Sequence, residues 1–331
     1  MNTITSTLGS ISLGASSTFR NLSVIPLLAE TTFQRDYLGL AEAVRTGTAR
    51  VGEVSSGGSV PELMIENSGA KPVLILEGEE LVGAKQNRTA NVTILVPAGK
   101  SLRIPVTCVE SGRWAYQGEN LEPSRQVHFA RGRLNKMLSV SDSMRQAGSR
   151  HADQGRVWHD IAQKSARMHV SAPTSAMSEV FESNRDRLDD YVGAFTPLPS
   201  QVGAVFAIGD RIEGLELFDC RETLAEMLPK LVRSYAIDAI ERNASQQGPP
   251  AEDAALRFVE AVKGSEFDTY PAVGAGTEIR LQTRDLVAAG LVADERLVHL
   301  VAFAAGADER RGDPESHWID RLRTRRNRMR R

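Results

Sequence analysis

The sequence contains few cysteines, few aromatic residues and no familiar metal-binding or catalytic motif. Two cysteines in 331 residues cannot form a disulfide framework, and no CxxC motif or Cys/His cluster is present to bind zinc. The six histidines show neither HExxH nor HxH spacing, and Walker A and GxSxG motifs are missing. We therefore expect no metal site and no bound cofactor, and composition alone identifies no reaction.

Long apolar runs are missing too. The N-terminal residues lack the basic stretch and the apolar segment that a secretion signal requires. Elsewhere the apolar runs, such as Val73–Leu76, are far too short to cross a bilayer. The sequence therefore predicts a cytoplasmic protein without membrane contact, in which Cys108 and Cys220 stay reduced and pack as small apolar side chains.

What the sequence does contain is an ordinary globular composition, with 41% hydrophobic and 25% charged residues. Its length is typical of about two domains or of one large fold. From residue 49 to residue 109, short strand-like runs alternate with Ser-Gly-Gly, Asn-Ser-Gly and Pro-Ala-Gly turns. This spacing predicts an antiparallel sheet or sandwich near the N-terminus.

The second half of the chain is richer in helical patterns. Apolar residues recur with a period of 3.6 from Leu224 to Ile240, although Pro229 is expected to kink or restart that helix. Residues 202–218 interrupt the helices with a β-hairpin around a Gly-Asp turn. The predicted fold is therefore α+β, with an N-terminal antiparallel β-sheet or sandwich followed by an α-rich region with a β-hairpin.

These patterns divide the chain into four expected segments. Residues 1–115 are expected to form the antiparallel β domain, and the polar residues 116–155 a connecting excursion over the surface. Residues 156–306 are expected to form the helical region, and residues 307–331 a basic, disordered tail.

The most informative stretch runs from Glu77 to Trp114. On a strand, alternate residues share a face, so the apolar rows of two neighbouring strands end at Arg88 and at Glu110. If the buried apolar faces fix the register, Val96 meets Leu102 across a five-residue loop. That register predicts that Arg88 lies opposite Glu110.

An apolar face that ends in an opposed Arg and Glu is a plausible rim of a polar ligand pocket. Gln86, Asn87, Arg113 and Trp114 flank it in the sequence. Arginine can grip a phosphate or carboxylate with a fork of N–H groups, and tryptophan can stack on a planar ring. The alternative is a partly buried Arg88–Glu110 salt bridge that closes the sheet, with the tryptophan packed over it.

Other candidate side chains have structural alternatives of their own. Asp219 lies three residues before a Glu at the start of the best helix, which indicates either a helix cap or a site carboxylate. Glu77, Glu79 and Glu80 could serve acid–base or metal chemistry, or lie on a solvated turn. Gln154 and Trp158 could also reach the pocket from the helix predicted there, but Trp158 fits the apolar stripe of that helix, so the alternative is a place in the core.

The segments LEGEELVGAKQNR, VPAGKSLRIPVTCVESGRW and QVGAVFAIGDRIEGLELFD together resemble a prokaryotic family. It is the family named for its association with ADP-ribosylglycohydrolases and rhodanese-like phosphatases. The resemblance covers roughly residues 20–305, and its motif positions in this chain include Gln86–Arg88, Glu110, Gly112–Trp114 and Asp219. The name implies a place in nucleotide or ADP-ribose metabolism, or in signalling that uses it, and no family mechanism comes with it.

Two hypotheses of function follow. In the first, the protein binds or processes a nucleotide-like small molecule related to ADP-ribose, and whether it is an enzyme stays open. Arg88 and Arg113 would bind anionic groups of the ligand, and Trp114 would stack on it or cap it. Glu110 would position Arg88 or accept a hydrogen bond from a ligand hydroxyl. It is also the one candidate for a catalytic residue, as a general base. In the second, the protein is a non-enzymatic adaptor and the same motifs are structural.

The basic C-terminus is the partner-binding element of the second hypothesis. Arg321–Arg331 contains seven arginines and no acid, so it could contact nucleic acid or an acidic protein with a strong dependence on salt. The remaining chain has 33 basic residues against 42 acidic ones, so it is acidic. The positive charge of the tail cancels most of this, which gives the total charge of −2. The tail could therefore also contact its own body or a second copy in a homo-oligomer.

Overall fold

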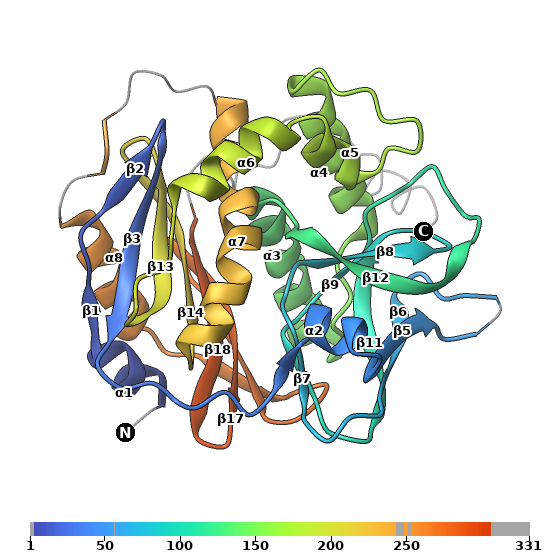
Figure 1. Cartoon of the computed structure of the whole chain (residues 1–331), viewed down its shortest axis with the longest axis horizontal. Coiled ribbons are helices and arrows are strands. Elements are labelled where there is room, and N and C mark those ends of the chain that lie inside the picture. Colours follow the sequence, from blue (N-terminus) through green and yellow to red (C-terminus); the bar gives the residue numbers. More distant parts are fainter. Residues whose placement is uncertain (1–2, 56, 243–247, 251–252, 306–331) are drawn as a thin grey trace, which may run out of the picture.

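Strands from both ends of the chain meet in one large antiparallel sheet (Figure 1). The computed structural model describes residues 3–55, 57–242, 248–250 and 253–305. Within these residues the sheet is nine-stranded, with the order β1-β3-β13-β14-β18-β17-β16-β15 and with β2 also paired to β3. Its strands are β1 (Ile11–Leu13), β2 (Ser17–Phe19), β3 (Leu22–Ala29), β13 (Gln201–Ile208), β14 (Arg211–Phe218), β15 (Asp268–Pro271), β16 (Thr277–Gln282), β17 (Leu286–Ala293) and β18 (Arg296–Ala304).

The predicted hairpin is confirmed as β13 and β14, which pair antiparallel around a two-residue turn. Gly209 adopts a φ of +59° in that turn, a conformation that glycine enters without the steric cost that a Cβ atom adds. Every residue of β13 is buried. A strand buried on both sides indicates that the sheet is covered on both faces.

Helices provide that cover. α1 (Thr3–Gly9) and α8 (Ala254–Lys263) pack on one face, and α7 (Arg221–Arg242) lies along the other (Figure 1). The ring of Tyr235 on α7 stacks on Phe206 of β13 at 4.1 Å. α7 also contacts barrel strand β12, so it is buried nearly all round, and it runs through Pro229 without the expected restart.

Six strands between residues 49 and 127 form a closed barrel with the order β11-β6-β5-β12-β8-β9. The prediction of an antiparallel β region is confirmed, but closure replaces the expected open sheet or sandwich. Closure satisfies the edge strands that a sandwich would expose. The barrel strands are β5 (Ala49–Glu53), β6 (Glu62–Asn67), β8 (Glu79–Ala84), β9 (Arg88–Ala90), β11 (Ser101–Cys108) and β12 (Gln117–Val127).

A small three-stranded sheet lies beside the barrel, formed by β10 (Ile94–Val96), β7 (Val73–Ile75) and β4 (Leu38–Gly39). Val96 pairs with Val73 in it, so the predicted pairing of Val96 with Leu102 is wrong. The apolar run that suggested one strand is instead shared between two sheets, because residues 91–93 carry the chain out of the barrel. α2 (Leu40–Arg45) follows β4.

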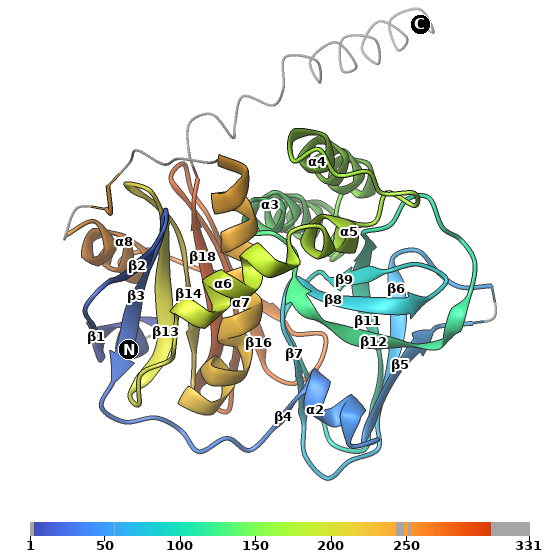
Figure 2. The ribbon, with the colours of Figure 1, turned by 45° about the horizontal axis from the view of Figure 1, so that its top comes forward.

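The polar stretch 116–155 differs from the expected surface excursion. It contains β12 of the barrel and α3 (Ala130–Ala147), a helix with a largely buried face. α3 and α7 lie between the sheet and the barrel in both views (Figure 2). The remaining helices, α4 (Gln154–Arg167), α5 (Met177–Glu182) and α6 (Arg185–Ala194), extend this middle layer.

The strand pairing also departs from the expected segment boundaries. β1–β3 belong to the sheet that the C-terminal half completes, so residues 1–115 do not form one β unit. Helices precede the barrel as well as follow it, and thus the α+β class is confirmed while its expected order is not. Residues 306–331, which include the basic tail, lie outside the described residues.

Candidate ligand-binding site

The predicted site residues lie at one end of the barrel, on the loop between β8 and β9, on the first residue of β9, and on the loop after β11. In the ladder between β9 and β11, Arg88 lies opposite Cys108. The prediction that Arg88 faces Glu110 is therefore wrong by two residues. Hydrogen bonds join the loops instead, for example from the Asn87 backbone N–H to Glu110 Oε2 at 3.1 Å.

Glu110 has a different cationic partner, Arg113. The Arg113 side chain donates from Nη2 to Glu110 Oε2 at 2.7 Å and from Nε to Oε1 at 3.0 Å, a bidentate and buried pair. Burial alone would raise the pKa of Glu110, but hydrogen bonds led by those of Arg113 lower it overall. The carboxylate is therefore ionised at neutral pH, with both of its oxygens occupied.

The other donors of Arg113 hold the loop after β8. Nη1 donates to the carbonyl oxygens of Ala84 at 2.7 Å and Ala115 at 2.8 Å. Nη2 donates to Asn87 Oδ1 at 3.0 Å and to the Gly83 carbonyl at 3.4 Å. Arg113 thus crosslinks the two loops, and its guanidinium group already has protein acceptors on every side.

The backbone is closely packed at the end of β8 and on the loop after β11, and it is strained at Ala84. Gly83 has a φ of +127°, and a Cβ atom there would lie 2.6 Å from the carbonyl oxygen of Asn120. Ala84 has a φ of +41°, which costs free energy for a residue with a side chain. A Cβ on Gly112 would lie 2.8 Å from the backbone of Thr174. These constraints explain why the segments VGAKQNR and ESGRW carry glycine where they do.

Arg88 is fully buried yet incompletely paired. Its Nη1 donates to Gln86 Oε1 at 3.1 Å, whereas Nε and Nη2 have no hydrogen-bond partner among the described residues. The Trp114 ring lies over the guanidinium, with its centroid 5.7 Å from Cζ. Burial lowers the pKa of Arg88, and no carboxylate among the described residues forms an ion pair with it. A buried cation with free donors is the least satisfied charge of this cluster.

Gln154 and Trp158 reach the same strand end from α4. Gln154 accepts from the backbone N–H of Cys108 at 2.9 Å and donates to its carbonyl at 2.8 Å, which imitates a neighbouring strand. The buried Trp158 Nε1 has no hydrogen-bond partner in the described structure. Burial raises the pKa of the Cys108 thiol, so it stays protonated and unreactive at neutral pH.

Sequence reasoning missed two residues of this end of the barrel, Lys85 and Tyr116. The Lys85 ammonium lies 5.2 Å from the ring centroid of Trp114 and 5.1 Å from that of Tyr116. Trp114 is 49% exposed and Tyr116 52%. Lys85 stands inside the GAKQNR motif and Tyr116 two residues after Trp114, so their proximity to predicted residues was the available signal.

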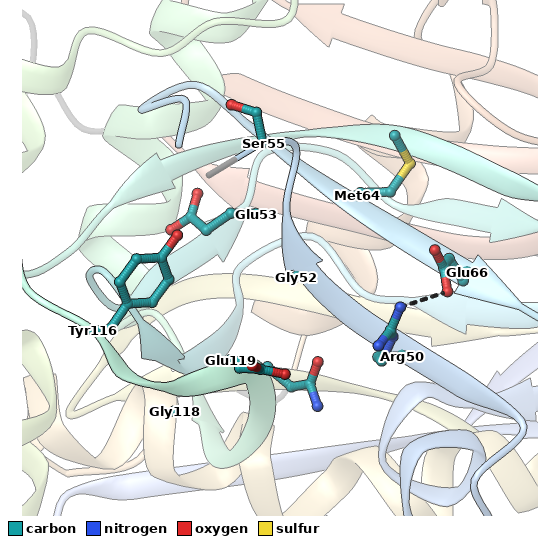
Figure 3. A pocket seen from close by; sticks show the side chains of 10 residues that line it. Arg50, Gly52, Glu53, Ser55, Met64, Glu66, Tyr116, Gly118 and Glu119 are labelled. Atoms are coloured by element: carbon teal, nitrogen blue, oxygen red, sulfur yellow. Dashed lines mark hydrogen bonds and ion pairs between the residues drawn. The ribbon is translucent and has the colours of Figure 1, made fainter. Parts of the chain in front are cut away.

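A cavity of about 600 Å³ opens on the outer face of the barrel beside this aromatic pair. Figure 3 shows that the Tyr116 hydroxyl points toward the Glu53 carboxylate at its rim. None of the six predicted ligand-binding residues lines it, and Tyr116 connects it to the loops. Its lining residues are Arg50, Gly52, Glu53, Ser55, Met64, Glu66, Tyr116, Gly118, Glu119 and Asn120.

The three glutamates of the LEGEEL segment are buried, which contradicts the solvated turn considered for them. Glu79 pairs with Lys230 at 2.5 Å. Glu80 accepts from Gln126 at 2.9 Å, and burial raises its pKa to about 7. In the described residues, no group of three His, Cys, Asp or Glu side chains could hold a metal ion.

Glu77 belongs to a ring of buried polar groups between the barrel and the sheet. Arg133 donates to Glu77 at 2.9 Å and to Glu216 at 2.5 Å. Glu216 contacts His299 at 3.1 Å, and Thr93 contacts the other nitrogen of that ring at 2.9 Å. We call this ring, together with Lys136 at 3.0 Å from Glu77, the junction network.

Burial would raise the pKa of Glu77, but Lys136 and Arg133 lower it overall. A Cβ on Gly78, whose φ is +83°, would lie 2.9 Å from Arg133 Nε. The glycine of the LEGEEL segment therefore lets the Arg133 guanidinium lie against the backbone of the barrel. The network joins the barrel to the large sheet through paired, buried groups.

Asp219 accepts from the Tyr37 hydroxyl at 2.5 Å and lies 3.7 Å from Arg296. Burial raises its pKa. These partners belong to neither barrel loop. Its membership of a ligand site stays a prediction, and its polar contacts are with Tyr37 and Arg296 rather than with the six residues above.

A family model described as "ARG and Rhodanese-Phosphatase-superfamily-associated Protein domain" matches residues 10–303. No curated protein and no solved structure matches the chain. No helix among the described residues is long and apolar enough to span a membrane. Because the family match includes the sheet, the barrel and both loops, the chain belongs to the ARG and Rhodanese-Phosphatase-superfamily-associated Protein domain family.

Proposed function

We propose that the protein binds a nucleotide-like small molecule at the end of the barrel. A planar group of the ligand stacks on Trp114 or Tyr116, and its anionic group lies near Lys85 and Arg88. The rest of the ligand extends into the neighbouring cavity. The family description, which names association with two enzyme superfamilies, supports a ligand related to ADP-ribose, as the resemblance implied.

One observation carries this proposal. The Lys85 ammonium lies 5.2 Å and 5.1 Å from the ring centroids of the half-exposed Trp114 and Tyr116, and Tyr116 lines a cavity of about 600 Å³. Exposed aromatic faces bind planar bases by stacking, and a cation beside them attracts a phosphate. Cavities of this volume are typical of small-molecule sites.

The charges of the cavity indicate how such a ligand is oriented. Glu53, Glu66 and Glu119 line it, and only Arg50 opposes them, in an ion pair with Glu66 at 3.1 Å. An acidic lining disfavours phosphate but accepts hydrogen bonds from hydroxyl groups. We therefore place the sugar hydroxyls in the cavity and the phosphate on the side of Lys85.

The structure changes the roles that we propose for the six predicted residues. Arg88 and Trp114 keep direct roles in binding, as gripping and stacking groups. Gln86 positions Arg88 by accepting from its Nη1. Asn87, Glu110 and Arg113 hold the loops together, because their side chains bind one another and the backbone. Glu110, with both oxygens bound by Arg113, is a positioning residue in this proposal rather than a general base.

Thermal-shift and calorimetric titrations with ADP-ribose, AMP and adenosine test the proposal. We expect at least one nucleotide to bind, and the double substitution Trp114→Ala/Tyr116→Ala to weaken it about tenfold or more, since stacking on one base contributes about 1–3 kcal/mol. Phe33→Ala is the matched control, because Phe33 is equally exposed at 51% and lies on the segment between the sheet and the barrel.

Absence of binding by all three compounds would overturn the proposal. That result would favour the adaptor hypothesis, in which Trp114 and Tyr116 contact a protein. Equal weakening by the Phe33 control would show that the aromatic pair has no special role.

A further inference from the structure

Two N–H donors of the Arg88 guanidinium, Nε and Nη2, have no hydrogen-bond acceptor among the described residues. Nε and Nη2 lie on the same edge of the planar group, so their two N–H bonds can point at two oxygens of one anion. Nη1, on the other side, is already bound to Gln86. Neither Nε nor Nη2 has a hydrogen-bond partner within the described residues, although the side chain is 0% exposed.

We infer that Arg88 binds a terminal phosphate group of the ligand. Nε and Nη2 hold this phosphate, and the Trp114 ring covers it. This inference rests on the proposed function and names the part of the ligand that carries its charge. It selects nucleotides and sugar phosphates with a phosphate monoester at one end over ligands whose phosphates are all internal.

The surroundings fix the fork in place. The Gln86 carboxamide that receives Nη1 donates to the Glu110 carbonyl at 2.9 Å and accepts from the Cys108 thiol at 3.1 Å. Glu110 is in turn bound to Arg113. The acceptor of Arg88 Nη1 is thus anchored on both loops, and a preorganised guanidinium loses less entropy on binding.

The nearby negative charges do not satisfy Arg88. Glu110 is paired with Arg113, and Glu53, although its Oε2 is buried without a hydrogen-bond partner, forms no ion pair with Arg88 among the described residues. A buried charge without full pairing costs free energy, and an anion on the fork would recover it.

Enclosure explains the preference for a terminal group. Gln86 and Cys108 lie against Arg88 within the protein, and Trp114 lies over it. Because the guanidinium is inaccessible while the ring covers it, Trp114 must swing aside to admit an anion, and that half-exposed ring can do so. A monoester enters from this one side, whereas an internal phosphodiester would need a second exit for its other substituent.

Calorimetry on the full chain with AMP, ADP-ribose and adenosine tests this phosphate site. We expect AMP to bind at least tenfold more tightly than the other two, because only AMP carries a terminal phosphate. Arg88→Lys keeps a positive charge but loses the fork, so it should weaken AMP about tenfold or more and leave adenosine unchanged. Arg103→Lys is the matched control, an exposed arginine on barrel strand β11.

Two outcomes overturn the inference while the proposed function stands: ADP-ribose binding as tightly as AMP, or AMP binding that is insensitive to Arg88→Lys. If none of the three compounds binds, the proposed function itself fails.

If Arg88→Lys does not fold, a competition experiment on the wild-type chain tests the phosphate site instead. Inorganic phosphate should displace AMP but not adenosine, with a fluorescence change that Trp114→Phe abolishes, and phosphate that displaces neither contradicts the phosphate site.

Discussion

Two clusters of buried charge lie at opposite ends of barrel strand β8, and they differ in how completely their cations are paired. In the junction network, Arg133 has a carboxylate on each side, and both carboxylates have further partners. The barrel-end cluster comprises Lys85–Arg88, Glu110, Arg113 and Trp114. Within the part of the chain that the structure describes, Arg88 keeps two donors without a hydrogen-bond partner, next to the half-exposed Trp114 ring. A fully paired network fixes the fold, whereas a cluster with one open cation is suited to a ligand.

Backbone strain follows the same division. Positive φ occurs beside both regions, at Gly78 next to the junction network and at Gly83 and Ala84 next to the barrel-end cluster, but only Ala84 has a Cβ that makes this conformation costly. Arg113 binds the Ala84 carbonyl oxygen at 2.7 Å. Strain of this kind persists only where surrounding contacts hold it, and it is concentrated at functional sites. The following predictions separate the two regions by their effects on stability and on binding.

The largest effect is expected from Arg133→Met. The substitution leaves the buried Glu77 and Glu216 without their shared cation, which should lower the free energy of unfolding by about 3–5 kcal/mol. Urea denaturation followed by circular dichroism measures it. Arg103→Met, at an exposed ion pair, is the control and should change it by less than about 0.5 kcal/mol. A loss below about 1 kcal/mol for Arg133→Met would show that the network does not hold the fold.

A pH effect nearly as large is expected from Glu80. Burial raises its pKa to about 7 from an ordinary value of 4.5, so the folded state binds its proton more tightly than the unfolded state does. Stability from this group is therefore complete below about pH 4.5 and is lost as the pH rises to about 7, by roughly 3 kcal/mol.

Glu80→Gln should remove this dependence. The stability of the wild type minus that of the variant should fall between pH 4.5 and pH 8, as measured by urea denaturation at each pH. Glu77 should show the opposite dependence of stability on pH, because Lys136 and Arg133 outweigh burial and lower its pKa. A constant difference between wild type and Glu80→Gln would contradict the assignment.

A smaller effect, about 2 kcal/mol beyond the control, is expected from Gly83→Ala. A Cβ there would lie 2.6 Å from the Asn120 carbonyl, in addition to the positive φ. Gly47→Ala is the control, since Gly47 also has a positive φ but has no atom within 4 Å of the added Cβ. Thermal denaturation of both variants separates the clash from the backbone cost, and equal losses would exclude a close approach at Gly83.

The smallest effect on stability is expected from Trp114→Ala. Its ring is half-exposed and its main contacts are with Lys85 and Arg88, so the free energy of unfolding should fall by less than about 1 kcal/mol. Denaturation by urea checks it. A loss of 3 kcal/mol or more would place Trp114 in the core and remove it from the site.

The sequence predicts the local elements better than their connections. The hairpin β13–β14 and helix α7 follow from period-2 and period-3.6 patterns, and both are confirmed. Closure of the barrel and the pairing of β3 with β13 depend on contacts between distant segments, which the apolar pattern does not encode. When every residue of a strand is apolar and buried, the sequence pattern does not indicate which sheet the strand joins.

For the candidate site, the residues that the sequence singled out do lie together in the structure, but their predicted pairing is wrong. Arg88, Glu110 and Arg113 do lie together, but Glu110 pairs with the arginine three residues away rather than with the one across the ladder. A shift of two residues keeps every side chain on the same face, so alternation cannot distinguish the two registers. Burial of Glu77, Glu79 and Glu80 was also hidden, because their cations come from α3 and α7.

Calorimetric titration of AMP into the wild-type chain and into Trp114→Ala/Tyr116→Ala tests most directly whether the open cluster is the ligand site. We predict that AMP binds to the wild type and that its affinity for the double variant, whose fold should be intact, is reduced about tenfold or more. Binding of AMP that is equal in both proteins, or undetectable in the wild type together with ADP-ribose and adenosine, would contradict it.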